Sequence, residues 1–130
     1  MRGNSMTKTE VKNLLFSYQQ LVMKQKIWKE CLKISNDICL KKDYQKNLLQ
    51  LNIINESLNL LKEEHKFVIE KHLIQHYVWK ETLELFEEKW GVMNSRSERT
   101  SKRMQSEGLE KILEFIKTSK LESYFQESCE

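Results

Sequence analysis

The sequence predicts an all-α fold, with an N-terminal helical hairpin followed by a C-terminal helix-turn-helix bundle. Three observations support this prediction. The 130 residues include no proline and only three glycines, so the residues that most often interrupt helices are scarce. Apolar residues recur at steps of three and four, which gathers them on one face of a helix. We find no convincing alternation with the period of two that is typical of strands.

The first predicted unit is a helical hairpin over residues 6–61, preceded by a leader over residues 1–5. Thr7 and Glu10 have the spacing of a capping box, so a helix is expected to begin there. It should continue to a break at residues 35–37, after which a second helix returns antiparallel to it. Each helix carries a seam of apolar residues: Val11, Leu14, Tyr18, Leu21, Trp28 and Leu32 on the first, and Tyr44, Leu48, Leu51, Ile54, Leu58 and Leu61 on the second.

The seam of the first helix can be used in two ways. Leu14, Tyr18, Leu21 and Trp28 are our candidates for a homodimer interface, because steps of three and four keep one stripe facing a partner helix. The same stripe would also serve as the core of a monomer. The residues alone leave both alternatives open.

The second predicted unit is a helix-turn-helix domain over residues 62–118. Helices are expected over residues 63–77 and 78–90, and Gly91 should end the second of them because glycine tolerates left-handed geometry. Residues 119–130 should form a short tail helix.

The last helix of this unit is expected to begin near Arg96, because Ser95 and Glu98 have capping-box spacing. Ser119 and Glu122 have the same spacing at the start of the tail. Gly108 falls inside the predicted last helix, where glycine costs about 1 kcal/mol relative to alanine. That cost indicates close packing against a neighbouring element.

Charge is distributed unevenly over the second unit. The whole chain has a formal charge of only +3. Two lysines against four glutamates give residues 78–90 a net charge of −2, and four cations against two glutamates give residues 91–107 a net charge of +2. An acidic helix followed by a basic one is typical of a helix-turn-helix, in which the second helix lies in a DNA groove.

Several short motifs follow one another from about Leu60 onward. They are Leu60 with Glu63 or Glu64 ahead of Val68-Ile69, then Tyr77-Val78-Trp79, Ser97-x-x-Thr100 and Gly108-Leu109-x-x-Ile112. In this order the C-terminal half resembles the −35-reading domain of bacterial sigma factors. It is similar too to the phage late-gene regulators of the ArpU and RinA type, which share that domain.

The chain departs from the family pattern in two places. The link from Gly91 to Ser97 is longer, and Ser101 and Gln105 stand where the family has apolar residues. The chain also lacks the core-polymerase-binding region of a full sigma factor. The resemblance therefore implies a transcriptional regulator of phage or prophage type.

The basic segment supplies the candidate DNA-binding residues. Side chains near the start of a recognition helix meet base edges, where arginine can pair with guanine and glutamine with adenine. Arg96, at the helix start, is expected to hold a phosphate. The alternative is a solvated cationic face on an ordinary core helix. The candidates for base contacts are Arg99, Lys102 and Arg103, with Gln105 and Ser106 further along.

Other chemistries find little support in the sequence. Four glutamates over residues 81–88 are expected to solvate a helix face, and His72 and His76 to be structural although their spacing would suit a metal. No glycine-rich loop or nucleophile arrangement is present. We therefore expect no enzyme activity, no metal and no cofactor.

The remaining features concern location. Cys31, Cys39 and Cys129 lack CxxC spacing, so free thiols in a reducing cytoplasm are expected. No apolar run approaches the roughly 20 residues that span a bilayer, so no membrane contact is expected.

The sequence thus predicts a cytoplasmic regulator that binds double-stranded DNA as a homodimer, with RNA polymerase as a further candidate partner. Two alternatives remain. One is a helical protein-interaction module that reads no DNA, and the other is a DNA-packaging adaptor like the small terminase subunits.

Overall fold

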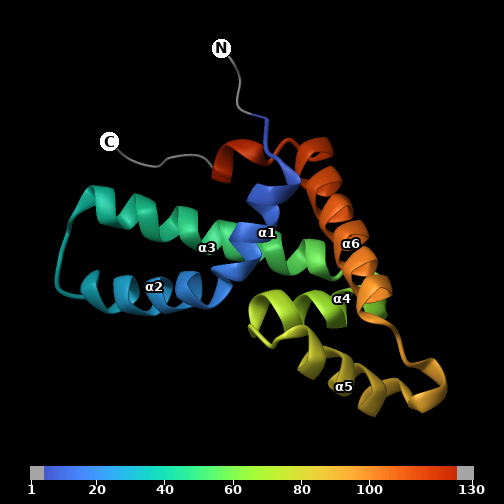
Figure 1. The fold of residues 1–130 in the computed structure, drawn as a ribbon. Helices are drawn as coiled ribbons and strands as arrows, with labels where there is room; N and C mark the ends of the chain where they lie inside the picture. The colour runs from blue at the N-terminus through green and yellow to red at the C-terminus, as the bar shows by residue number, and fades with distance from the viewer. Residues whose placement is uncertain (1–4, 126–130) are drawn as a thin grey trace.

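The computed structural model describes residues 5–125, and every regular element in them is helical, which confirms the all-α class. Figure 1 shows the arrangement, with a two-helix projection on one side and a long helix on the other. The elements are α1 (Lys8–Phe16), α2 (Tyr18–Cys31), α3 (Ile38–Leu58), α4 (Glu63–Ile69), the π-helical η1 (Glu70–Ile74), α5 (Trp79–Trp90), the 3₁₀ turn η2 (Val92–Asn94), α6 (Glu98–Thr118) and the 3₁₀ turn η3 (Glu122–Phe125).

The first helix begins where the sequence predicts. Thr7 accepts a hydrogen bond from the Glu10 backbone, and the Glu10 carboxylate accepts one from the Thr7 N–H at 2.8 Å, which confirms the capping box. The prediction of one continuous helix up to residues 35–37 is wrong, because the chain breaks at Ser17 into α1 and α2. The break lets α1 cross the core while α2 packs along α3 (Figure 1).

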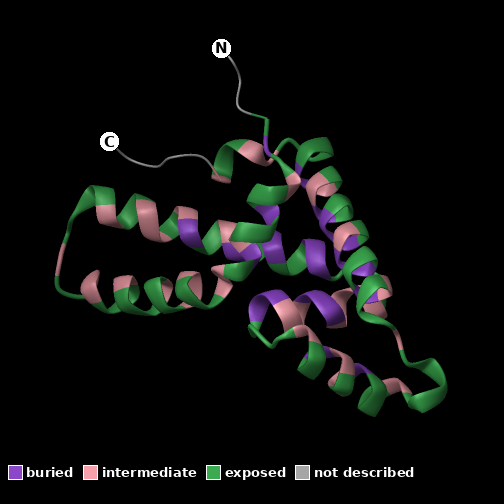
Figure 2. Ribbon diagram, viewed as in Figure 1, coloured by how far each residue is buried: buried purple, intermediate pink, exposed green. Residues whose placement is uncertain are grey.

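Helices α2 and α3 form the predicted antiparallel hairpin, and its outer part is what we call the arm, residues 18–46. Asp37 caps α3 by accepting from the Leu40 backbone. No residue of α2 is buried, and the first buried residue of α3 is Asn47, which donates to the Leu21 carbonyl at 3.0 Å. Figure 2 shows the arm mainly exposed or half-buried, whereas buried residues concentrate where α3 meets α1, α4 and α6.

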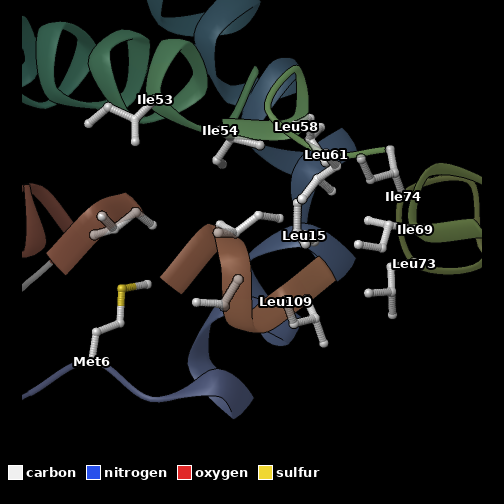
Figure 3. Packing of buried hydrophobic residues seen from close by; sticks show 13 residues of the cluster. Met6, Leu15, Ile53, Ile54, Leu58, Leu61, Ile69, Leu73, Ile74 and Leu109 are labelled. Carbon is white, nitrogen blue, oxygen red and sulfur yellow. The ribbon is translucent and has the colours of Figure 1, made fainter. Parts of the chain in front are cut away.

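The main core joins the two units predicted from the sequence. It draws on α1, the second half of α3, α4, η1 and α6, so the predicted boundary between residues 61 and 62 lies inside one hydrophobic cluster (Figure 3). Its buried members are Met6, Val11, Leu15, Ile53, Ile54, Leu58, Leu61, Ile69, Leu73, Ile74, Leu109, Ile112 and Ile116.

Three of the four residues predicted at a homodimer interface contact this core. Leu14, Tyr18 and Leu21 are half-buried against it, and the Tyr18 hydroxyl donates to Asn55 Oδ1 at 2.8 Å. Trp28 is also half-buried, but it is not among the residues packed against the main core. The chain's own core therefore accounts for most of the seam. Beyond Leu21, the apolar residues of the arm are the ones least shielded from solvent.

The helix predicted over residues 63–77 ends earlier than expected. It passes from α4 into the π-helical η1 and stops before His76, which has a positive φ of 65°. The next helix ends as predicted at Gly91, whose φ is +91°.

The tail differs from its prediction. Ser119 is the C-cap of α6 rather than the start of a new helix, and residues 122–125 form only a 3₁₀ turn. The Glu122 carboxylate accepts from the Met6 N–H at 2.8 Å, so it ties the two ends of the described chain together instead of capping a helix. Residues 1–4 of the predicted leader and residues 126–130 of the predicted tail lie outside the described residues.

Gly108 explains how closely α6 approaches α4. A Cβ built at Gly108 would lie 2.5 Å from Ile69 Cδ1, inside van der Waals contact. The close packing predicted from a glycine within a helix is therefore confirmed.

Replacing Gly108 by alanine should destabilise the protein, because the added methyl meets Ile69 Cδ1. Overpacking costs about 1–3 kcal/mol, which outweighs the gain of about 1 kcal/mol in helix propensity. In an Ile69→Val background, which lacks Cδ1, Gly108→Ala should instead stabilise by about 1 kcal/mol. Urea unfolding of the four proteins measures both effects, and a stabilising Gly108→Ala in the wild-type background would contradict the packing argument.

Candidate nucleic-acid interface

A second, smaller core fixes α5 beside α4 and α6. Its buried members are Val68, Phe86 and Met104. The Phe67 ring meets the Phe86 ring edge to face at 5.9 Å and the Trp90 ring at 5.0 Å. These contacts place α5 as the helix that supports the N-terminal half of α6.

The turn between α5 and α6 is held by polar contacts. Arg96 Nη2 lies 3.1 Å from Glu64 Oε2, and its Nη1 donates to the Asn94 carbonyl at 2.6 Å. The turn also carries two apolar side chains, Val92 and Met93, which are 73% and 95% exposed. Arg96, predicted to hold a phosphate, is thus engaged in fastening this turn to α4.

Helix α6 begins two residues later than predicted. Its N-cap is Ser97, whose hydroxyl accepts from the Thr100 backbone at 3.1 Å. The capping box predicted between Ser95 and Glu98 is wrong, because the Ser95 hydroxyl donates to Glu87 of α5.

The outward face of the first turns of α6 is cationic. Arg99, Lys102 and Arg103 are all exposed. Lys102 pairs with Glu98 at 2.8 Å across one helical turn, whereas Arg99 and Arg103 make no ion pair with any described residue. We call these three residues the basic face.

Nearby carboxylates on α6 are already paired. Glu107 lies 3.7 Å from His65 Nε2 on α4, and Glu110 lies 3.2 Å from Lys8 Nζ on α1. Neither partner was evident in the sequence, because each contact joins residues more than 40 positions apart. Lys8 therefore partly offsets the charge of Glu110, whereas His65, whose pKa is lowered by burial, carries little charge at neutral pH with which to offset Glu107.

The inward face of the same turns is unusually polar. Ser101 is fully buried and Gln105 is 7% exposed, and neither Ser101 Oγ nor Gln105 Oε1 has a hydrogen-bond partner among the described residues. Gln105 was predicted to read a base; it does not face outward, because it lies one turn beyond Ser101 on the buried side of α6.

Ser106, the last DNA-binding candidate, is half-buried and engaged within the chain. Its Oγ accepts from Lys8 Nζ at 2.6 Å. Among the six candidate residues, then, Arg99, Lys102 and Arg103 share one exposed face, whereas Arg96, Gln105 and Ser106 serve other contacts.

The three histidines have separate structural partners. The His72 ring stacks on Trp79 at 3.8 Å and donates from Nδ1 to the Tyr77 carbonyl at 2.8 Å. The His76 ring stacks on Phe16 at 4.2 Å. Burial lowers the pKa of both His65 and His72 below the usual value for histidine.

No metal site is evident in this region. Among residues 5–125, no group of three or more His, Cys, Asp or Glu is placed to hold a metal ion. No helix in the same range is long and apolar enough to cross a bilayer.

No family model, curated protein or solved structure matches the chain.

The unpartnered hydroxyl of Ser101 gives a stability prediction with a matched control. Ser101→Ala should stabilise the protein by about 1 kcal/mol, because it removes a buried polar group that forms no hydrogen bond. Ser57 is equally buried in α3 but donates to the Ile54 carbonyl at 2.8 Å, so Ser57→Ala should gain less or destabilise. Thermal unfolding compares the two, and equal effects would show that Ser101 has a partner in solution.

Proposed function

We propose that the protein is a DNA-binding transcriptional regulator that reads duplex DNA with the first turns of α6. One observation carries the proposal: Arg99 and Arg103 are exposed, stand one turn apart on α6 and lack a carboxylate partner among the described residues. Free guanidinium groups in this position are available to guanine edges or phosphates.

The surroundings of α6 support this mode of binding. Its inner face is packed against four other helical elements, so the helix can dock in a major groove without rearranging. Lys102 is paired only with the half-exposed Glu98. Exposed ion pairs contribute little to stability, so Lys102 can exchange that carboxylate for a DNA phosphate at small cost.

Arg96 has a different role in this proposal. Because it links Glu64 to the turn before α6, it sets where the helix begins instead of contacting DNA. The proposal therefore assigns DNA contact to the basic face, and it assigns no enzymatic step to any residue.

The first test is selection from a pool of random DNA duplexes at two salt concentrations. The wild-type chain should enrich one sequence and bind it more weakly as salt rises. The Arg99→Ala/Arg103→Ala variant should lose at least about tenfold in affinity, because each bidentate arginine–base pair is worth about 1–3 kcal/mol.

A matched control lies on the same helix. Lys111→Ala/Lys117→Ala also removes two exposed cations from α6, but further toward its C-terminal end. It should retain the enriched sequence and most of the affinity. Equal losses in the two double variants would mean that binding follows net charge only and would remove the recognition role of α6.

The arm is a second exposed surface, and its apolar side chains favour self-association of the chain. The arm exposes large apolar side chains, among them Met23 and Ile27 at 60% and 58%, and Trp28 is only half-buried there. We propose that two arms pack against each other in a homodimer, so that two copies of α6 read two half-sites.

The arm's charge makes this proposal testable. Seven lysines against three acidic residues give residues 18–46 a net charge of +4. Two such arms repel each other, and salt screens the repulsion. Dimer formation should therefore strengthen as salt rises, opposite to DNA binding.

Sedimentation equilibrium at low and high salt measures this effect. Met23→Ser/Ile27→Ser should weaken the dimer, whereas Arg99→Ala/Arg103→Ala should leave it unchanged. A monomer at every salt concentration would contradict self-association. It would favour a different protein as the partner that binds the arm. A ring of many copies would favour the packaging adaptor.

A further inference from the structure

A surface pocket lies where α1 packs against α6. Its volume is about 220 Å³, and both helices contribute to its lining: Lys8, Thr9 and Lys12 from α1, and Gln105, Ser106 and Leu109 from α6. The pocket adjoins the basic face, because Ser106 stands three residues after Arg103 and four after Lys102, on the same side of the helix.

The wall formed by α1 is cationic. Lys8 Nζ is held in place by Ser106 Oγ at 2.6 Å and Glu110 at 3.2 Å. Lys12 follows one turn later, is exposed, and has no ion pair with any described residue. An unpaired ammonium group therefore stands beside a lysine that is already oriented.

Lys12 lines the same pocket as Ser106, so it lies on the side of α6 that carries the basic face. Burial lowers the pKa of His72 most, and Lys12 and Lys102 lower it further because both cations lie near the same imidazole. Lys12 of α1 therefore adds an exposed cation beside the basic face of α6.

The buried end of the pocket is polar. Gln105 is more than nine-tenths buried, yet its Oε1 accepts no hydrogen bond from a described residue. A carboxamide offers donors as well as an acceptor. The unsatisfied atom is an acceptor, so it can take a hydrogen bond from a hydration water, whereas a phosphate, itself an acceptor, would be bound by the lysines of the rim.

We propose that Lys12, supported by Lys8, binds a backbone phosphate of the DNA held on α6, so that α1 forms a second wall of the interface. The proposal rests on the DNA binding proposed above. Phosphate contacts position a protein on the duplex but carry no direct sequence information. The role of α1 is therefore to add affinity and to fix the orientation of α6 in the groove.

The test uses the full chain and the DNA sequence that the wild type enriches. Each phosphate contact contributes about 0.9 to the slope of log affinity against log salt for duplex DNA. Lys12→Ala should lower that slope by about 0.9, so the loss of affinity between 50 and 200 mM salt becomes about three- to fourfold smaller than in the wild type. Its sequence preference should stay unchanged.

Lys26→Ala is the matched control, since Lys26 is an exposed lysine of α2. Figure 1 shows α2 on the opposite side of the molecule from α6. Its salt slope should equal that of the wild type. Thermal melting checks that both variants fold. Because Lys12 makes no ion pair with a described residue, its replacement should leave the melting temperature unchanged.

Each other outcome has a definite meaning. A wild-type slope in Lys12→Ala, with wild-type DNA binding intact, would overturn this proposal and leave the proposed function standing. A changed sequence preference would make Lys12 a base contact and overturn the phosphate role. Failure of the wild type to bind any duplex would remove both proposals.

Discussion

The packing of α6 through one face is the constraint on which the rest of the structure depends. Ile112 and Ile116 are buried in the main core, and Gly108 lets the helix approach Ile69 so closely that no larger side chain fits without a shift. Because the buried residues of α6 run from Ser101 to Ile116, packing of the inner face also sets the orientation of the outer face. Arg99 and Arg103 point into solvent as a consequence of what the other side of the helix buries.

The inward face of α6 is polar in its first turns and apolar toward its C-terminal end, so the two ends of the helix are held by different contacts. Toward its C-terminal end α6 buries aliphatic side chains, whereas its first turns bury Ser101 and Gln105 without partners among the described residues. Buried polar groups that lack hydrogen bonds are unfavourable. The first turns are therefore held mainly by Met104 and the aromatic cluster on α5, and the last turns by the main core.

Features set by local chemistry could be predicted from the sequence, and features set by distant contacts could not. The all-α class, the Thr7 capping box and the end of α5 at Gly91 depend on residues a few positions apart, and the structure confirms them. The break at Ser17, the burial of Gln105 and the link from Arg96 to Glu64 depend on elements that meet only in the folded chain. Periodicity shows that a helix has an apolar face; it does not show where the chain must turn so that two such faces meet.

The two proposed surfaces are independent because the core separates them. The arm joins the rest of the chain through Tyr18 and Leu21, which are half-buried against the main core, and through polar contacts such as the hydrogen bond from Asn47 to the Leu21 carbonyl. The basic face and Lys12 belong instead to α6 and α1, which pack on each other and share the main core. A partner bound to the arm can therefore leave the cationic surface unchanged. Association through the arm would raise the local concentration of a second α6 without altering how either copy meets DNA.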